Sequence, residues 1–351
     1  MRWLLILIGI VWVAPEASAQ IFRFQAVKQL RVMQEKLQGC LLDFTYNHGV
    51  DRRLYSPSLE MKRDLYIYLP PGYDEKKCYP LLIWLHGIGQ DETSFLDLAE
   101  LFDAAILCGK LPPMVIAAPD GSIQGRASYR NSGSFYLNSK AGRFEDWVQI
   151  EVWNFVTEHF SIRPERGAHI IGGASMGGFG AYNHAFKHRE RYATIIGILP
   201  ALNLRYADCT NNYFSDFDPN CYKLQTNVQR RAPVARFYGV LVFRQRDLLD
   251  PLFGRDQISA GKVAAENPVE MLAAYRIRPG EFNMYVGYGD KDEFNIDAQA
   301  ESFIYTAVRC HGLTVTGQKV INGTHDTATG KLMFPALVPW LNALVEPYAP
   351  K

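Results

Sequence analysis

A glycine-rich turn between an apolar run and a helical pattern constrains this chain more than any other feature. The run 169–172 leads into the Gly-x-Ser-x-Gly turn 173–177, and a helical pattern then continues from Met176 to about His188. A serine on so sharp a strand-to-helix turn has a strained backbone, which is tolerable only where the residues two positions away on either side lack bulk. This context is that of a nucleophile elbow. The sequence therefore predicts a catalytic Ser175, with a plain glycine-rich turn as the alternative.

A serine hydroxyl is a poor nucleophile at neutral pH, so this prediction requires an acid and then a histidine later in the chain. His325 lies on a turn after the apolar run 315–321, whereas His311 fits the C-terminal end of a helix, where a cation is favourable. The loop 289–294 offers three carboxylates. We expect Asp292 to be the acid of the triad, with Asp290 as the alternative.

An acyl-transfer site also needs two backbone amides that converge on the developing oxyanion. The amide of Met176, at the start of the helix, is one candidate. The loop that follows the apolar run 81–85 supplies the second, for which we favour Ile88 over Gly87. His86 is kept as a substrate-contact candidate, although its place at a strand end favours a structural hydrogen-bonding role.

Aromatic residues near these loops are further candidates for contact with the substrate, because they could line an acyl or aromatic pocket. Packing within surface loops would explain them equally well. They are Tyr129, Phe135, Tyr136 and Trp147.

Short apolar runs alternate with helical patterns along most of the chain. Runs that are apolar on both faces suit parallel strands buried between helices, and the clearest helical pattern covers residues 145–160, with a shorter one at 25–37. We expect an α/β fold, a three-layer sandwich with a mostly parallel central sheet. Residues 202–278 exceed one strand-helix step, so we expect an insertion or lid after the sixth strand region. The strands are expected at 63–69, 81–85, 114–118, 169–172, 193–199, 282–287 and 315–321.

The first nineteen residues have the pattern of an export signal. Arg2 precedes an apolar run at 3–13, and the small residues 17–19 resemble a cleavage site. We expect residues 1–19 to be a signal peptide, with an uncleaved membrane anchor as the alternative. Residues 20–60 would then pack on the core as an N-terminal segment, 61–351 would form the main domain, and the protein would be secreted or periplasmic.

Export changes the interpretation of the six cysteines, because disulfides persist outside the cytoplasm. The favoured pair is Cys209 with Cys221, which bracket a polar, turn-rich stretch. Closing so short a loop would stabilise the fold by roughly 3 kcal/mol. Cys108 and Cys310 fit small apolar residues of the core at least as well.

Charge and histidine spacing exclude other classes of function. The 37 basic and 36 acidic side chains leave a formal charge of +1, so nucleic acid is not an expected partner. His184 and His188 have the spacing of zinc ligands but lack the glutamate of the usual motif, and we expect no metal or other cofactor. No apolar run after the first is long enough to span a membrane.

Several further motifs occur along the chain, at 68–74, 79–82 with the 86–87 loop, 118–121, 135–139 with 142–145, and 173–178. Together they resemble the esterase D-like group of α/β-hydrolases, which includes feruloyl and acetyl esterases, S-formylglutathione hydrolase and mycolyltransferases. The resemblance is close over residues 63–199 and resumes near Tyr285. It implies a metal-independent serine hydrolase with Ser175, Asp292 and His325 at the triad positions and the Ile88 loop at the oxyanion position. Residues 202–278 match no subfamily, which leaves the choice of substrate open.

The expected function is hydrolysis of a carboxylic ester through an acyl-enzyme, on a small-molecule or carbohydrate-linked substrate. One alternative is acyl transfer to a sugar or lipid alcohol, and another is a non-catalytic binding protein that has kept the fold. The sequence does not reveal the oligomeric state.

Overall fold

A single eight-stranded sheet organises the chain in the computed structural model, which describes residues 30–351 except 48, 129–132, 238–240 and 256. The strand order is β1-β4-β6-β5-β9-β10-β15-β16. Only β4 runs against the others, since it is antiparallel to both of its neighbours. The strands are β1 (Cys40–Phe44), β4 (Leu65–Leu69), β5 (Leu81–Leu85), β6 (Val115–Pro119), β9 (His169–Ala174), β10 (Thr194–Ile198), β15 (Asn283–Gly289) and β16 (Val315–Val320).

Helices cover both faces of this sheet, because its central strands are apolar on both sides. Every residue of β5, β6 and β10 is buried, as is typical of parallel strands between two layers of helices. On one face α2 (Leu96–Leu107) meets α10 (Thr327–Val345), where the rings of Phe102 and Phe334 lie 5.0 Å apart. On the other face α5 (Met176–Lys187) meets α9 (Ile296–Tyr305) through Tyr182 and Phe303, 5.1 Å apart. The expected three-layer α/β-hydrolase fold is confirmed.

The remaining elements outside the insertion are short. They are β2 (Leu54–Ser56), β3 (Met61–Arg63), η1 (Glu92–Phe95), β7 (Asn138–Ser139), β8 (Gly142–Arg143), α3 (Phe144–Asp146), η2 (Trp147–Val152), α4 (Trp153–His159), η3 (Arg166–Ala168), η4 (Thr306–Cys310) and η5 (Glu346–Tyr348). The helix expected at 145–160 is therefore α3, a π-helical segment η2, and α4 in succession. The strand expected at 63–69 is divided between β3 and β4.

The N-terminal segment packs on the core where it is described. The helix expected at 25–37 is seen from residue 30 to residue 36, and Leu30, Leu37 and Leu41 are buried. The signal peptide expected at 1–19 lies outside the described residues. Within the described ranges, no helix is both long enough and apolar enough to cross a bilayer.

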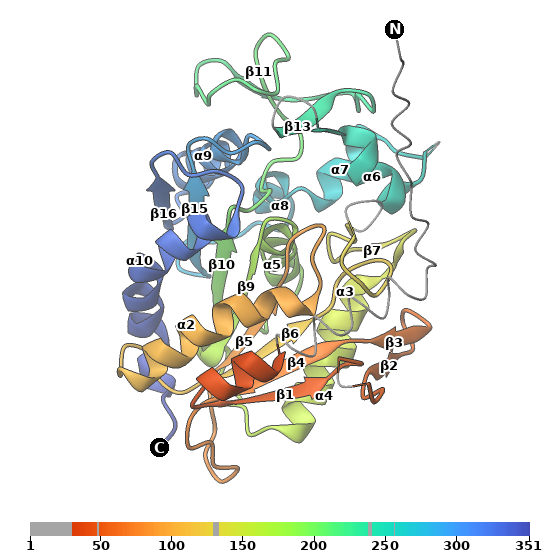
Figure 1. The fold of residues 1–351 in the computed structure, drawn as a ribbon. Helices are drawn as coiled ribbons and strands as arrows, with labels where there is room; N and C mark the ends of the chain where they lie inside the picture. The colour runs from red at the N-terminus through yellow and green to blue at the C-terminus, as the bar shows by residue number, and fades with distance from the viewer. Residues whose placement is uncertain (1–29, 48, 129–132, 238–240, 256) are drawn as a thin grey trace, which may run out of the picture.

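Residues 202–278 leave the sheet after β10, its sixth strand in chain order, and return to it at β15. In Figure 1, β11, β13, α6 and α7 gather at one end of the molecule, at the top of the view. The elements are β11 (Tyr206–Asp208), β12 (Tyr222–Leu224), β13 (Pro233–Phe237), β14 (Leu241–Arg244), α6 (Gln245–Phe253), α7 (Ala260–Glu266) and α8 (Pro268–Ala274).

One disulfide lies within this insertion. Cys209 and Cys221 are bonded across the β11-β12 hairpin, as expected from their spacing. The expectation of a core position for Cys108 and Cys310 is wrong, because both are exposed. Cys108 caps the C-terminal end of α2, and Cys310 is the last residue of η4.

Candidate active site

The turn between β9 and α5 holds Ser175 in a conformation that side chains rarely adopt, with φ 54° and ψ −115°. Both flanking glycines are required here by the space available. A Cβ on Gly173 would lie 2.5 Å from the backbone of Gly177, and a Cβ on Gly177 would lie 2.0 Å from the carbonyl oxygen of Leu85. The Ser175 amide donates to the carbonyl of Ile198, at 2.8 Å. The turn is thus clamped between β5 and β10, and its geometry is that of a nucleophile elbow.

Three side chains that are far apart in the sequence meet at this turn. His325 Nε2 lies 2.8 Å from Ser175 Oγ, and His325 Nδ1 lies 2.6 Å from Asp292 Oδ2. Asp292 follows β15 and His325 follows β16, so the carboxyl ends of parallel strands supply all three groups. The Asp292 side chain is fully buried and that of His325 is 11% exposed.

Asp290, the alternative acid, is bonded elsewhere. Its Oδ1 accepts a hydrogen bond from the backbone amide of Asn322, at 2.6 Å, and so ties the loop after β15 to the turn after β16. His311 lies at the C-terminal end of η4, as its sequence context suggested. The structure therefore brings Asp292, and not Asp290, to the imidazole.

The electrostatics of the imidazole favour its protonated form. Burial lowers the pKa of His325, but the charge of Asp292 and its hydrogen bond to the ring outweigh burial and raise the pKa above its ordinary value of 6.5. An orienting carboxylate at Nδ1 places the remaining lone pair of the neutral ring on Nε2, which faces Ser175.

Two residues next to Asp292 support the histidine and were not singled out in the sequence. Glu293 Oε2 accepts the backbone amide of His325, at 2.8 Å. The ring of Phe294 lies 4.7 Å from the imidazole and also packs against Phe237 and Phe243 of the insertion. The acidic loop 289–294 therefore contacts the histidine and is not simply solvated. The sequence signal that could have identified Glu293 and Phe294 is their position directly after Asp292.

Backbone amides at Ile88 and Met176 are free to receive an oxyanion. Neither amide has an acceptor among the described residues, and both residues border a small cavity at Ser175. The Gly87 amide, by contrast, donates to Gln90 Oε1 at 2.9 Å. A Cβ on Gly87 would lie 3.5 Å from the Ser175 Cβ, so this loop directly adjoins the nucleophile. The amides of Ile88 and Met176 therefore remain the candidate donors of an oxyanion hole.

Two cavities open at Ser175. The larger, of about 410 Å³, lies between α2 and α10 and is bordered by His325 and by apolar side chains. The smaller, of about 40 Å³, is bordered by Met176 and by residues of the insertion.

Comparison with known proteins assigns the chain to a family. Residues 56–314, well over half of the chain, match the family described as "Putative esterase". The chain belongs to this esterase family. It is a carboxylic-ester hydrolase of the α/β-hydrolase fold, in agreement with the esterase D-like and feruloyl esterase-like resemblance of its motifs.

Solved structures share the fold of the esterase at low sequence identity. A ferulic acid esterase superposes with a TM-score of 0.61 at 19% identity, over 88% of this chain and 99% of that chain. An S-formylglutathione hydrolase from Agrobacterium tumefaciens gives 0.63 at 16% identity, over 88% and 96%. The fluorophosphonate-binding serine hydrolase FphF of Staphylococcus aureus gives 0.56 at 16% identity, over 87% and 99%.

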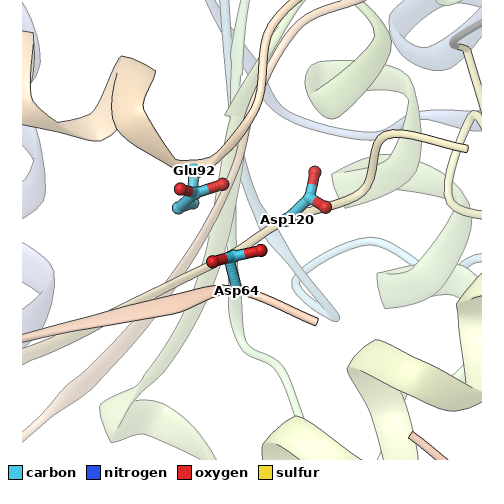
Figure 2. A group of neighbouring side chains, drawn as sticks. All are labelled: Asp64, Glu92 and Asp120. Carbon is cyan, nitrogen blue, oxygen red and sulfur yellow. The ribbon is translucent and has the colours of Figure 1, made fainter. Parts of the chain in front are cut away.

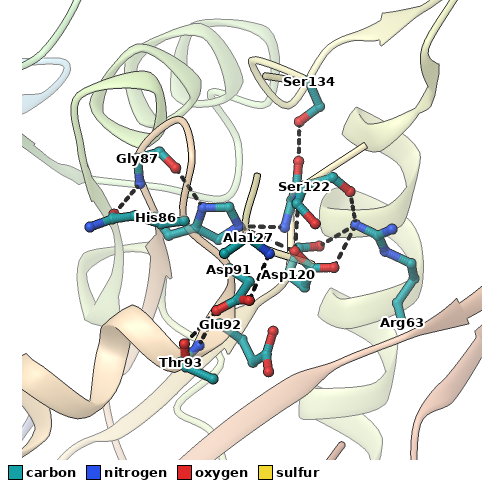
Figure 3. Close-up of polar contacts among 12 residues, drawn as sticks. Arg63, His86, Gly87, Asp91, Glu92, Thr93, Asp120, Ser122, Ala127 and Ser134 are labelled. Atoms are coloured by element: carbon teal, nitrogen blue, oxygen red, sulfur yellow. Dashed lines mark hydrogen bonds and ion pairs between the residues drawn. The ribbon is translucent and has the colours of Figure 1, made fainter. Parts of the chain in front are cut away.

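His86 of the esterase fixes the loop that carries Ile88 (Figure 3). The His86 ring accepts the Gly121 amide at Nε2 and donates from Nδ1 to the carbonyl of Gly87, each at 2.8 Å. Because Nε2 accepts, the proton is assigned to Nδ1. The Gly87 carbonyl and the Ile88 amide belong to one trans peptide and point in opposite directions. The His86 ring therefore sets the direction of the Ile88 amide, in addition to bordering the larger cavity.

The expectation that Tyr136 and Trp147 contact substrate is corrected by their burial. Both are fully buried, and neither borders either of the two cavities described at Ser175. The Tyr136 hydroxyl accepts the His86 amide at 2.9 Å, and Trp147 Nε1 donates to the Asp120 carbonyl at 2.9 Å. They support the loops behind the site. Phe135 does border the smaller cavity, and Tyr129 lies outside the described residues.

The esterase also contains a group of three buried acidic residues (Figure 2). Asp64, Glu92 and Asp120 bring carboxylate oxygens within 4.8 Å of one another, a donor set that could hold a metal ion. Asp120 already pairs with Arg63, at 2.8 Å. Burial, with the nearby charge of Asp120, raises the pKa of Asp64 to about 7. Burial raises the pKa of Glu92 well above its usual range. Protons on Asp64 and Glu92 thus relieve the repulsion within the group near neutral pH.

His184 and His188, which have the spacing of zinc ligands, are each hydrogen-bonded to a different protein group. His184 Nε2 lies 2.7 Å from the Tyr136 carbonyl, whereas His188 Nε2 lies 3.0 Å from Glu145 Oε1. Burial lowers the pKa of His184 to about 4. Each ring is therefore engaged in a separate hydrogen bond.

Asp64→Asn is expected to make the stability of the esterase less sensitive to alkaline pH. The folded-state pKa of Asp64 is raised, so its contribution to stability is full below about pH 4 and is lost as the pH rises through about 7. Asparagine stays neutral and can still accept the Tyr46 amide, now 3.1 Å from Asp64 Oδ1. Thermal unfolding should show a Tm for the variant at least a few degrees above the unmodified protein near pH 8, and a smaller difference near pH 5. Asp97→Asn, at an exposed position of α2, is the control. Equal losses of Tm between the two pH values in all three proteins would contradict the expectation.

Proposed function

We propose that the esterase hydrolyses its substrate through an acyl-enzyme formed on Ser175. The observation that carries this proposal is the continuous pair of contacts from Ser175 Oγ to His325 Nε2, at 2.8 Å, and from His325 Nδ1 to Asp292, at 2.6 Å. Such a chain lets a hydroxyl lose its proton as it attacks. The open amides of Ile88 and Met176 beside the hydroxyl support the same chemistry.

Each group has one task in the proposed cycle. Ser175 Oγ attacks the ester carbonyl while His325 Nε2 takes the proton, and Asp292 stabilises the imidazolium that forms. The oxyanion accepts hydrogen bonds from the Ile88 and Met176 amides, and loss of one such donor typically costs about 10²- to 10³-fold in rate. His325 then protonates the leaving alcohol. Water repeats the sequence on the acyl-enzyme and releases the carboxylic acid.

The pH dependence of hydrolysis tests this proposal. His325 acts as a base only when it is neutral, and its pKa is raised above 6.5, so kcat/KM on a short-chain ester should fall as the pH decreases, with its midpoint above pH 6.5. Labelling of Ser175 by a fluorophosphonate should follow the same curve, since both reactions need the same alkoxide. A flat profile between about pH 5 and pH 9, or labelling of a different serine, would refute the proposal.

We also infer that the protein works outside the cytoplasm, as a secreted or periplasmic enzyme. The Cys209–Cys221 disulfide supports this location, since such bonds persist in oxidising compartments. The apolar run and small residues at 3–19 support it independently.

A further inference from the structure

The two cavities at Ser175 are bordered by different members of the proposed reaction centre. Ser175 and Ile88 border both cavities. His325 borders only the larger cavity, and Met176 borders only the smaller one. The base and one of the two oxyanion amides therefore lie on opposite sides of the nucleophile.

This asymmetry separates the two halves of an ester. In the proposed mechanism, the alcohol oxygen must come within hydrogen-bonding reach of His325 Nε2 in order to receive its proton. The acyl substituent needs no proton and extends away from the base. The alcohol half therefore extends into the larger cavity, on the His325 side, and the acyl half extends toward the smaller cavity, on the Met176 side.

The walls of the larger cavity are suited to an apolar chain. They come from Leu98 and Phe102 of α2 and from Phe334 and Leu337 of α10, with Trp84 of β5 also contributing. Phe102 and Leu337 are almost completely buried. Charged groups, Asp326 and Lys331, belong to the turn and first helical residues after His325 and are exposed. Most of the lining side chains are therefore apolar. The polar residues His86, Gln90 and Ser94 also border the cavity.

The sizes of the cavities set the lengths of the two halves. At about 30 Å³ for each small group, 410 Å³ has room for roughly fourteen such groups. The 40 Å³ of the smaller cavity has room for about one such group.

We propose that the preferred substrates of this enzyme are esters of a short acid, of about acetyl size, with a long apolar alcohol. The inference rests on the acyl-enzyme mechanism proposed above and adds the substrate class to it. In the first step the bond between Ser175 Oγ and the carbonyl carbon forms and the bond from that carbon to the alcohol oxygen breaks. The proton that His325 took from Ser175 passes to the departing oxygen, which leaves as a neutral alcohol. Water then releases the short acid.

Two isomeric esters test which half of the substrate each cavity receives, because the two molecules have the same atoms. Octyl acetate and ethyl octanoate have the same formula, and they differ only in which side of the ester carries the long chain. Each methylene buried from water contributes up to about fourfold in binding, so kcat/KM for octyl acetate should exceed that for ethyl octanoate by about tenfold or more. Release of acid, followed by titration at constant pH, measures both rates.

A substitution in the wall should affect only the long-chain alcohol ester strongly. Leu98→Trp narrows the larger cavity and should lower the ratio of kcat/KM for octyl acetate to that for ethyl acetate by about tenfold. Leu107→Trp makes the same change on the same helix at a position that is 52% exposed, and should leave this ratio unchanged. Leu98→Ala, which widens the cavity, should shift the optimum toward longer alcohols and so replaces the tryptophan variant if that variant does not fold.

The outcomes separate this inference from the proposed function. If Ser175 is labelled by a fluorophosphonate and the two isomers are hydrolysed equally, or ethyl octanoate faster, the assignment of the cavities is overturned and the mechanism stands. If Ser175 is not labelled and neither isomer is hydrolysed, the proposed mechanism fails, and the assignment fails with it.

Discussion

Ser175→Ala is expected to lower kcat for hydrolysis of a short-chain ester by roughly 10⁴-fold or more, without loss of the fold. In the proposed mechanism, Ser175 Oγ is the atom that forms the bond to the acyl group, and the amides of Ile88 and Met176 cannot replace it. Alanine fits the space of serine, and its Cβ has the same steric relation to Gly173 and Gly177. The backbone of the turn should therefore keep its position.

Steady-state rates with active-site titration measure this effect, and circular dichroism with thermal unfolding reports the fold. Ser58→Ala, between β2 and β3 and away from both cavities, is the matched control and should retain full activity. A Ser175→Ala protein that keeps a tenth of the activity would show that another group is the nucleophile.

Asp292→Asn is expected to reduce kcat by about 10³- to 10⁴-fold. The Asp292 carboxylate accepts the Nδ1 proton of His325 at 2.6 Å, whereas an amide can present its NH₂ to the ring and favour the opposite tautomer. Nε2 would then carry a proton and could not accept the one on Ser175. The variant should also show an acid limb of kcat/KM at lower pH, because the charge that raises the pKa of His325 is lost.

Asp290→Asn provides a control in the same loop. Its oxygen can continue to accept the Asn322 amide, so activity should stay within a few-fold of the unmodified enzyme. A larger loss in Asp290→Asn than in Asp292→Asn would reverse the assignment of the acid. Measurement of both pH profiles, rather than of rates alone, distinguishes a changed tautomer from a displaced loop.

The elbow and the fold class were accessible from the sequence because their causes are local. Gly173 and Gly177 are required by the close approach of backbone, and the fully buried strands consist of apolar runs. The order of serine, acid and histidine then leaves few residues to consider. The sequence favoured Asp292 over Asp290 without deciding between them. Both are carboxylates of the same loop, and only the structure shows which of them faces His325.

Features that depend on packing between distant segments were not accessible. Tyr136 and Trp147 are aromatic residues near the oxyanion loop, but only the fold shows that they face the core and bond to the backbone of His86 and Asp120. The contact of Phe294 with His325 and with the insertion likewise joins three separate regions. Cys108 is exposed because it lies just beyond the end of α2. The apolar character of cysteine alone does not predict this position.

The groups proposed to react and the side chains that line the larger cavity come from different elements, which has a practical consequence for directed evolution. The groups proposed to react lie on turns at the carboxyl ends of β5, β9, β15 and β16, where Gly173 and Gly177 leave no space for variation. Leu98 and Leu337 lie instead on helices that carry none of these groups. A mutant library restricted to such helix positions would sample new specificities while most of its members keep a working reaction centre.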